Sequence, residues 1–172
     1  MDNKDFTERQ IEIMEAATLR IDKYGIQELT IKNLASDLNL SEAALYRHFK
    51  SKTEILLGLL TYFILEMNVR IADIIANKDE HPSELLRQVF VSQLNKFVQK
   101  PAIVSVIFSE GIFQFNKELS DKVSTMMALM QKNINALIVR GQKDAVYQKL
   151  LGAETITTII MGSMRMVVLK WK

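Results

Sequence analysis

Three residues that can cap helices, Thr30, Ser41 and Ser51, stand eleven and ten residues apart in the sequence. A Ser or Thr at a helix N-terminus accepts a hydrogen bond from a backbone N–H two or three residues later, so each of the three marks a helix start. These intervals leave room for only short helices. We therefore predict one short helix after Thr30, a turn at Asn39-Leu40, a second short helix over residues 42–49, and a longer helix after Ser51.

The apolar spacing predicts further helices on both sides of this segment. One begins after Thr7, which has Gln10 at capping-box spacing, and ends at Gly25. The helix after Ser51 has Glu54 at the same spacing and should end near Asn77. The remaining helices are expected over residues 82–99, 102–108, 117–140 and 153–170, with breaks at Lys100-Pro101, at Gly111, and at Gly141 or Gly152.

The composition agrees with an all-α fold, because the 172 residues are 48% apolar and include only two prolines. We expect an N-terminal helix-turn-helix domain over residues 1–50, joined by a long helix to a helical body over residues 51–172. The absence of cysteine excludes disulfides and thiolate metal sites. We predict no metal and no cofactor.

The balance of charge is nearly even, so bulk charge does not indicate a nucleic-acid partner. The first sixty residues contain eight Lys and Arg against ten Asp and Glu. Within residues 43–53, however, Arg47, Lys50 and Lys52 occur with no acidic residue. A phosphate-facing patch would have to be local to this segment.

Two segments bear on localisation. The N-terminus is polar and acidic, unlike a secretory signal. The stretch over residues 155–171 is apolar but is interrupted by Arg165 and Lys170, so we interpret it as a buried helix and not as a membrane span. We expect a cytoplasmic protein with no membrane partner.

Two short capped helices around a tight turn suit the major groove of DNA. The groove admits one α-helix, whose N-terminal residues reach base edges while the preceding helix crosses the backbone. Capped N-termini also present backbone N–H groups to phosphates.

The same segment resembles the N-terminal signature of the TetR (tetracycline-repressor) family of regulators. The resemblance covers residues 9–60, about a third of the chain, and rests on many spaced matches. These are Ile13-Met14-Glu15-Ala16-Ala17, Tyr24-Gly25, Leu29-Thr30, Leu34-Ala35, Leu40-Ser41, the run from Leu45-Tyr46-Arg47-His48 to Phe49-Lys50-Ser51-Lys52, and Ile55-Leu56.

The resemblance implies a role for each matching position. Thr30, Tyr46, His48 and Lys52 stand where the family contacts phosphates, with Ser41 as the cap and Lys50 in the local basic patch. Glu42, Ala43, Ala44 and Arg47 fall at variable positions of the recognition helix, where bases are read.

Two residues depart from the pattern of the family. Asn39 replaces a glycine in the turn, and Glu42 is acidic, so that it either accepts from a cytosine or repels phosphate. The simpler alternatives are that Tyr46 packs and hydrogen-bonds locally, that His48 is a solvent-exposed or capping histidine, and that Arg47 is ordinary solvated surface.

The resemblance also implies an effector pocket and a dimer interface in the helical body. We expect an apolar effector, with ordinary core packing as the alternative for each residue of its pocket. The candidate pocket residues are Phe63, Met67, Phe90, Phe97, Phe108, Met126 and Met130. The candidate interface residues, on a helix that is apolar on more than one face, are Ile160, Gly162, Ser163, Val167 and Trp171. Most relatives continue beyond this helix, so either the body is short or a final helix is missing.

These features favour a homodimeric, sequence-specific DNA-binding regulator, a repressor released from operator DNA by a small apolar effector. The alternative is a DNA-bound adaptor that tethers a protein partner without an effector. An enzyme is disfavoured, because the two histidines are far apart and there is neither a cysteine nor a glycine-rich phosphate loop.

Overall fold

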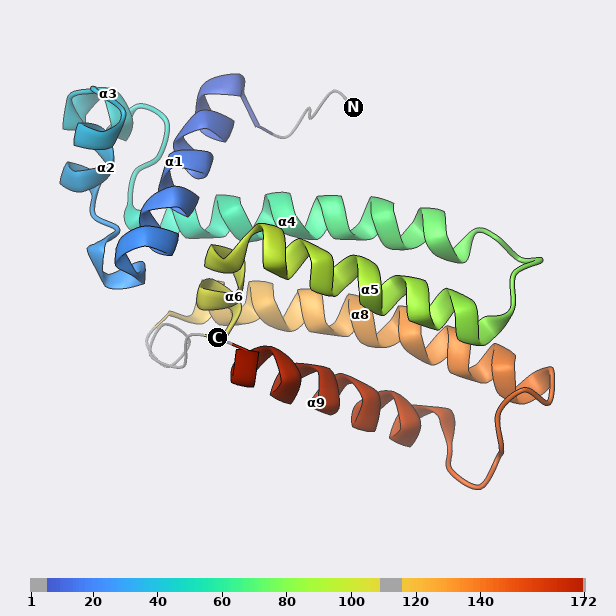
Figure 1. The fold of residues 1–172 in the computed structure, drawn as a ribbon. Coiled ribbons are helices and arrows are strands. Elements are labelled where there is room, and N and C mark those ends of the chain that lie inside the picture. The colour runs from blue at the N-terminus through green and yellow to red at the C-terminus, as the bar shows by residue number, and fades with distance from the viewer. Residues whose placement is uncertain (1–5, 109–115, 172) are drawn as a thin grey trace. The chain divides into compact units, whose positions relative to one another are not determined.

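The computed structural model of the chain describes residues 6–108 and 116–171, and within them it contains helices and no strand (Figure 1). The predicted all-α fold is therefore confirmed. The predicted break at Gly111 lies outside the described residues. The helices are α1 (Glu8–Tyr24), η1 (Ile26–Glu28), α2 (Ile31–Asp37), α3 (Glu42–Tyr46), α4 (Lys52–Ile75), α5 (Pro82–Gln99), α6 (Pro101–Ile107), α8 (Lys117–Lys143) and α9 (Ala153–Trp171).

The chain packs as two compact units. The first comprises Met1–Phe63 and Lys100–Lys122, and the second Ile64–Gln99 and Val123–Lys172. The boundaries between them fall inside α4, between α5 and α6, and inside α8. These units are defined by packing, so the predicted division by function at residue 50 stays a prediction.

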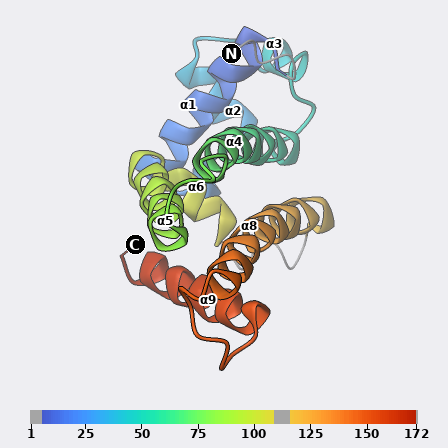
Figure 2. The same cartoon turned by 90° about the vertical axis from the view of Figure 1, so that its right-hand side faces the viewer.

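The first unit contains the three N-terminal helices, which gather at the start of α4 (Figures 1 and 2). The predicted capping box of α1 is present, with Thr7 and Gln10 bonding to each other's backbone N–H. The buried face of α1 consists of Ile13, Met14, Ala17 and Ile21. A Cβ at Gly58 of α4 would lie 2.9 Å from the sulfur of Met14, so this glycine permits a close approach of α4 to α1.

Helix α6 packs against α1 within the same unit. Its residues Ala102, Ile103, Val104, Val106 and Ile107 are all buried. Its own N-cap residue provides no side-chain cap. Burial raises the pKa of the Asp22 carboxylate on α1, and the nearby backbone of Ala102 on α6 partly offsets this.

In the second unit, α5 lies beside the second half of α4, and α8 and α9 complete the packing (Figure 2). The inner face of α5 buries Leu85, Val89, Gln93 and Phe97. Arg140 near the end of α8 donates to the carbonyl oxygens of Lys78 at 2.8 Å and Glu80 at 2.6 Å. Arg140 thus ties α8 to the loop between α4 and α5.

Helix α9 is poorly covered for an apolar helix, because only Thr157 and Val168 are buried. Val167 is 58% exposed, whereas Ile160 is half-buried and faces inward with Val168. An ideal Cβ at Gly162 would meet nothing within 4 Å, so the outer face is open.

The break between α8 and α9 falls at Gly152, and the alternative at Gly141 was wrong, because Gly141 lies inside α8. The chain turns after Lys143 through Ala145, which has a φ of 57°. The N–H groups of Val146 and Tyr147 then both donate to the carbonyl of Gly141, at 2.8 and 3.0 Å. This return places the ring of Tyr147 directly on Gly141.

Helix α4 is long and apolar enough to cross a membrane by length and composition, and half of its most apolar window is buried inside the structure. The sequence analysis had weighed residues 155–171 for this role instead. A mostly apolar helix that is buried in a protein core passes the same test.

Gly141→Ala should destabilise the protein by roughly 1–3 kcal/mol, because the new Cβ would lie 2.2 Å from Cδ2 and Cε2 of Tyr147. Urea unfolding would measure this. Gly152→Ala is the control, since a Cβ there meets nothing within 4 Å. In a Tyr147→Ala background the clash is absent, so a persisting loss at Gly141→Ala would contradict the account.

Candidate nucleic-acid interface

The turn between α2 and α3 is built from side-chain caps and one left-handed residue. Thr30 Oγ1 accepts from Asn33 N at 3.1 Å, and Ser41 Oγ accepts from Ala44 N at 3.1 Å. Asn39 has a φ of 52°. Asparagine adopts this conformation more readily than most residues, which explains why it can replace the glycine expected in the turn.

Helix α3 is shorter than predicted. It ends at Tyr46 and not at residue 49, and Arg47 and His48 form a turn. The N–H groups of His48 and Phe49 still donate to the carbonyl of Leu45, which closes the helix end. Leu45 and Phe49 are buried as predicted, so they anchor α3 from both sides of this turn.

The predicted DNA-contacting residues are mostly at the surface. Tyr46 is 48% exposed, and the side chain of His48 is half-buried. The backbone oxygen of His48 accepts from Gln10 Nε2 at 3.4 Å, which ties this turn to α1. The exposed members of the set are Thr30, Ser41, Glu42, Ala43, Tyr46, Arg47 and Lys50, and the half-buried members are Ala44, His48 and Lys52.

Lys52 has a structural contact that the sequence did not reveal. Its Nζ donates to the backbone oxygen of Ile26 at 2.7 Å, fastening η1 to the start of α4. Burial lowers the pKa of Lys52, and the nearby charge of Glu28 partly offsets this. Phosphate contact by Lys52 stays a prediction, and loss of the side chain would also remove the link to η1.

The start of α4 is capped by two residues, in a variant of the predicted pattern. Ser51 Oγ accepts from Glu54 N at 3.1 Å. The carboxylate of Glu54 reaches back to the backbone N–H of Lys50, one residue before the expected partner. This contact fixes the backbone of Lys50, whose own side chain is exposed.

An ion pair holds α2 against α1. Arg20 Nη2 donates to Asp37 Oδ1 at 2.9 Å, and its Nε donates to the other carboxylate oxygen. Arg20 also lies over the ring of Tyr24, 5.0 Å from its centre. The ion pair holds the pKa of Asp37 below its usual value. This contact fixes the angle at which α2 leaves α1, and therefore the position of α3.

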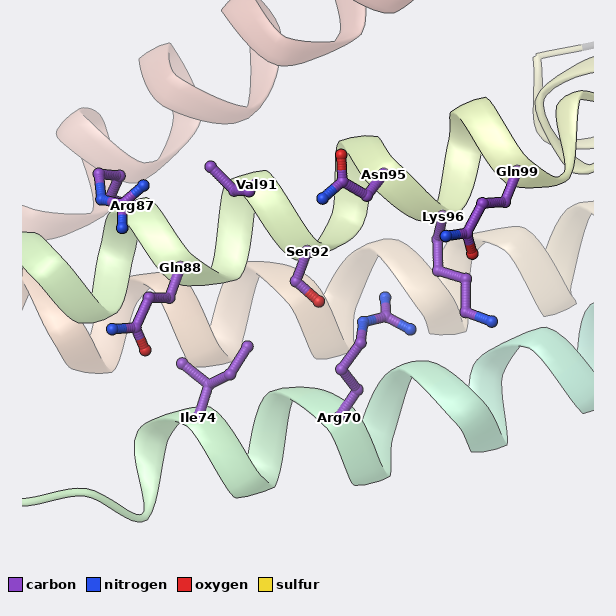
Figure 3. A pocket seen from close by; sticks show the side chains of 9 residues that line it. All are labelled: Arg70, Ile74, Arg87, Gln88, Val91, Ser92, Asn95, Lys96 and Gln99. Atoms are coloured by element: carbon purple, nitrogen blue, oxygen red, sulfur yellow. The ribbon is translucent and has the colours of Figure 1, made fainter.

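The residues predicted to line an effector pocket lie in both units. Phe63 and Phe108 belong to the first unit, and the other five to the second. Phe63, Met67, Phe97, Met126 and Met130 are buried, and Phe90 and Phe108 are half-buried. None of the seven lines the pocket that the structure describes between α4 and α5 (Figure 3). Their role as pocket residues stays a prediction.

The predicted interface residues lie mainly on the open face of α9. Gly162 and Ser163 are exposed, Val167 is 58% and Trp171 53% exposed, and only Ile160 is half-buried. Ile159 and Met166, which the sequence analysis did not name, are exposed on the same helix. Within residues 6–108 and 116–171, no group of three or more His, Asp or Glu side chains could hold a metal ion.

Residues 13–59 match the family model described as bacterial regulatory proteins of the tetR family. The N-terminal part of the chain is thus similar to the DNA-binding region of TetR-family regulators. The match covers the three N-terminal helices and the start of α4, which are the elements described above. The resemblance seen in the sequence over residues 9–60 is thereby confirmed.

Two similar proteins carry the name nucleoid occlusion factor SlmA. The one from Vibrio campbellii is 24% identical over 156 residues, covering 87% of this chain and 79% of the relative. The one from Shewanella oneidensis is 29% identical over 131 residues, covering 76% of this chain and 66% of the relative. The chain thus spans about two thirds to four fifths of the length of these relatives.

Solved structures share the fold along nearly the whole chain. A TetR transcription regulator from Haloarcula marismortui has a TM-score of 0.83 at 20% identity, covering 96% of this chain and 86% of that one. The regulator FadR from Bacillus subtilis, solved with stearoyl-CoA, has a TM-score of 0.79 at 19% identity, covering 94% of this chain and 86% of that one. This similarity establishes the TetR fold for the helical body.

Asp37→Asn should lower the stability of the protein at pH 7. A carboxylate whose pKa is depressed in the folded state stabilises it above the unfolded pKa, and this contribution is lost as the pH falls through the folded value. The urea midpoint of the variant should therefore converge on that of the parent below about pH 4. Asp73→Asn, at an exposed position of α4, is the control. Equal effects of both substitutions would show that the ion pair of Arg20 and Asp37 does not stabilise the fold.

Proposed function

We propose that the protein binds operator DNA as a homodimer, with α3 in the major groove and the starts of α2 and α4 against the backbone. The observation that carries this proposal is that α3 has one buried face and one exposed face. Leu45 is fully buried, while Ala43, Tyr46 and Arg47 are exposed. A short helix held by its core side and open on the other is what major-groove binding requires.

The exposed residues divide into two proposed roles. Tyr46, His48 and Lys50, with the cap at Thr30, contact phosphates and supply affinity, whereas Arg47 reads bases. Arg47 follows the last residue of α3, so its long side chain reaches the groove from the turn.

The N-terminal half of α3 completes the base-reading set. Ala43 and Ala44 are small enough to let the helix approach base pairs, behind the cap at Ser41. Glu42 is exposed in the first turn of α3. It either accepts a hydrogen bond from a cytosine or excludes sequences that bring phosphate close.

Dimerisation is proposed to use the outer face of α9. Ile159, Met166 and Val167 are each more than half exposed. Gly162 and Ser163 lie between them, which would let a second copy of the helix approach closely. Covering this face in a symmetric pair removes apolar surface from water.

Regulation is proposed to act through α4, whose 24 residues extend for roughly 36 Å. The helix begins at the DNA-binding elements and continues into the second unit. An effector that shifts it would change the spacing of two recognition helices and release the repressor, and DNA would weaken effector binding in turn. The apolar effector predicted from the sequence remains part of this proposal, as does a cytoplasmic location.

Lys50→Ala should weaken binding to all DNA sequences and reduce the salt slope by roughly one unit, because one phosphate contact is lost. Arg47→Ala should instead change base preference at one position of each half-site. Fluorescence anisotropy over a salt series, on operator and random duplexes, would measure both. Equal losses for the two variants on random DNA would contradict this division of roles.

Val167→Glu should convert the dimer to a monomer without unfolding it, because Val167 is exposed within the chain but covered in the proposed pair. Sedimentation velocity would show the change in mass. Val98→Glu is the matched control, since Val98 is 61% exposed on α5. A dimer that survives Val167→Glu would place the interface elsewhere.

The second candidate function is a DNA-bound adaptor, favoured by the similarity to SlmA proteins, whose name refers to the nucleoid. In that case the protein on operator-bearing DNA should recover a stoichiometric protein partner from a lysate. No small molecule should then change its affinity for DNA. Release of the DNA by a small molecule would support the repressor instead.

A further inference from the structure

The second unit contains a pocket between α4 and α5 that none of the sequence motifs accounts for. Its volume of about 480 Å³ falls in the range of small-molecule sites. Figure 3 shows Arg70 and Ile74 extending from α4 toward α5, and Ser92 and Lys96 extending from α5 toward α4. The full lining is Arg70, Ile74, Arg87, Gln88, Val91, Ser92, Asn95, Lys96 and Gln99.

Arg70 has hydrogen-bond donors that the protein does not match. Its Nη2 donates to Oε1 of the buried Gln93 at 2.7 Å. Its Nε and Nη1 are closed off from solvent and have no hydrogen-bond partner. Buried guanidinium donors are costly when left without an acceptor, and most buried polar atoms in proteins are paired. The site therefore lacks an acceptor.

The other two cations of the pocket already form ion pairs with carboxylates. Arg87 donates to both oxygens of Glu84, at 2.8 and 2.7 Å. Lys96 lies 3.5 Å from Glu66. Glu66 also stabilises the charged form of Arg70. Three cations against two carboxylates leave one net positive charge, which a single monoanion would balance.

The remaining lining is suited to an organic anion more than to an inorganic one. Ile74 and Val91 provide apolar surface on the two helices, and Val91 is 43% exposed. Ser92, Asn95 and Gln99 add neutral hydrogen-bonding groups. A ligand with one charged end and a short apolar part would use both kinds of surface.

We propose that this pocket binds a small organic monocarboxylate, whose carboxylate accepts hydrogen bonds from Arg70 and whose apolar part lies against Ile74. Binding requires the guanidinium to turn on its flexible side chain, because Nε and Nη1 are shielded from solvent in this structure. The proposal concerns binding alone, and it holds whether or not the ligand alters DNA affinity.

Isothermal titration calorimetry of the full chain at pH 7 and fixed ionic strength would test this, with sodium hexanoate as the probe. Hexanoate should bind once per chain, and 1-hexanol and inorganic phosphate should each bind at least roughly tenfold more weakly. No binding of hexanoate, or equal binding of hexanol, would overturn the proposal. Tighter binding of phosphate would overturn the choice of a carboxylate.

Arg70→Met should weaken hexanoate binding roughly tenfold or more, because a charge-assisted hydrogen bond is lost. Arg9→Met is the matched control, since Arg9 lies on α1 in the other unit and pairs with Glu12. Unchanged binding in a folded Arg70→Met variant would overturn the proposal.

Ile74→Glu keeps the test decisive if Arg70→Met does not fold. Residue 74 is one helical turn after Arg70, so the carboxylate of the new glutamate should pair with Arg70 in place of the ligand's carboxylate. The variant should lose hexanoate binding and melt at a higher temperature than the parent. Retained hexanoate binding, or a lower melting temperature, would count against the proposed site.

Discussion

The anchoring of α3 is the constraint on which the DNA-binding account depends. A helix of five residues is not stable by itself in water, because helix nucleation costs more than one turn returns. It persists here because Leu45 and Phe49 are buried on either side of its end, and because Ser41 caps its beginning. The exposed face is therefore held in place by contacts within the protein.

This anchoring extends outward through contacts between distant residues. The ion pair of Arg20 and Asp37 fixes α2 on α1, and Lys52 fastens η1 to the start of α4. Helix α6 packs against α1. Each contact joins elements that meet only in the fold, and together they make the first unit a single support for α3.

Whether a contact could be predicted from the sequence depends on whether its partners are local or distant along the chain. The caps at Thr7, Thr30 and Ser41 were predictable, because a cap and its partner lie three residues apart. The partners of Arg20 and Lys52 were not, because they lie 17 and 26 residues away. The covered face of α9 was not predictable, since an apolar helix does not reveal which side its neighbours cover.

The pocket between α4 and α5 illustrates the same limit. The sequence analysis selected aromatic and methionine residues for a binding site, and most of them are packed into the core. The pocket is lined instead by polar residues that, read along the chain, look like an ordinary solvated helix face. What distinguishes it is the unmatched guanidinium of Arg70, which appears only when Gln93 and Glu66 are brought beside it.

Sequencing of DNA fragments selected by the purified protein tests the central claim most directly. A homodimer that places two copies of α3 in successive major grooves predicts an inverted repeat. Its half-site centres should lie about one helical turn, or a multiple of it, apart. Fragments with no shared sequence, or with one unpaired half-site, would contradict the account.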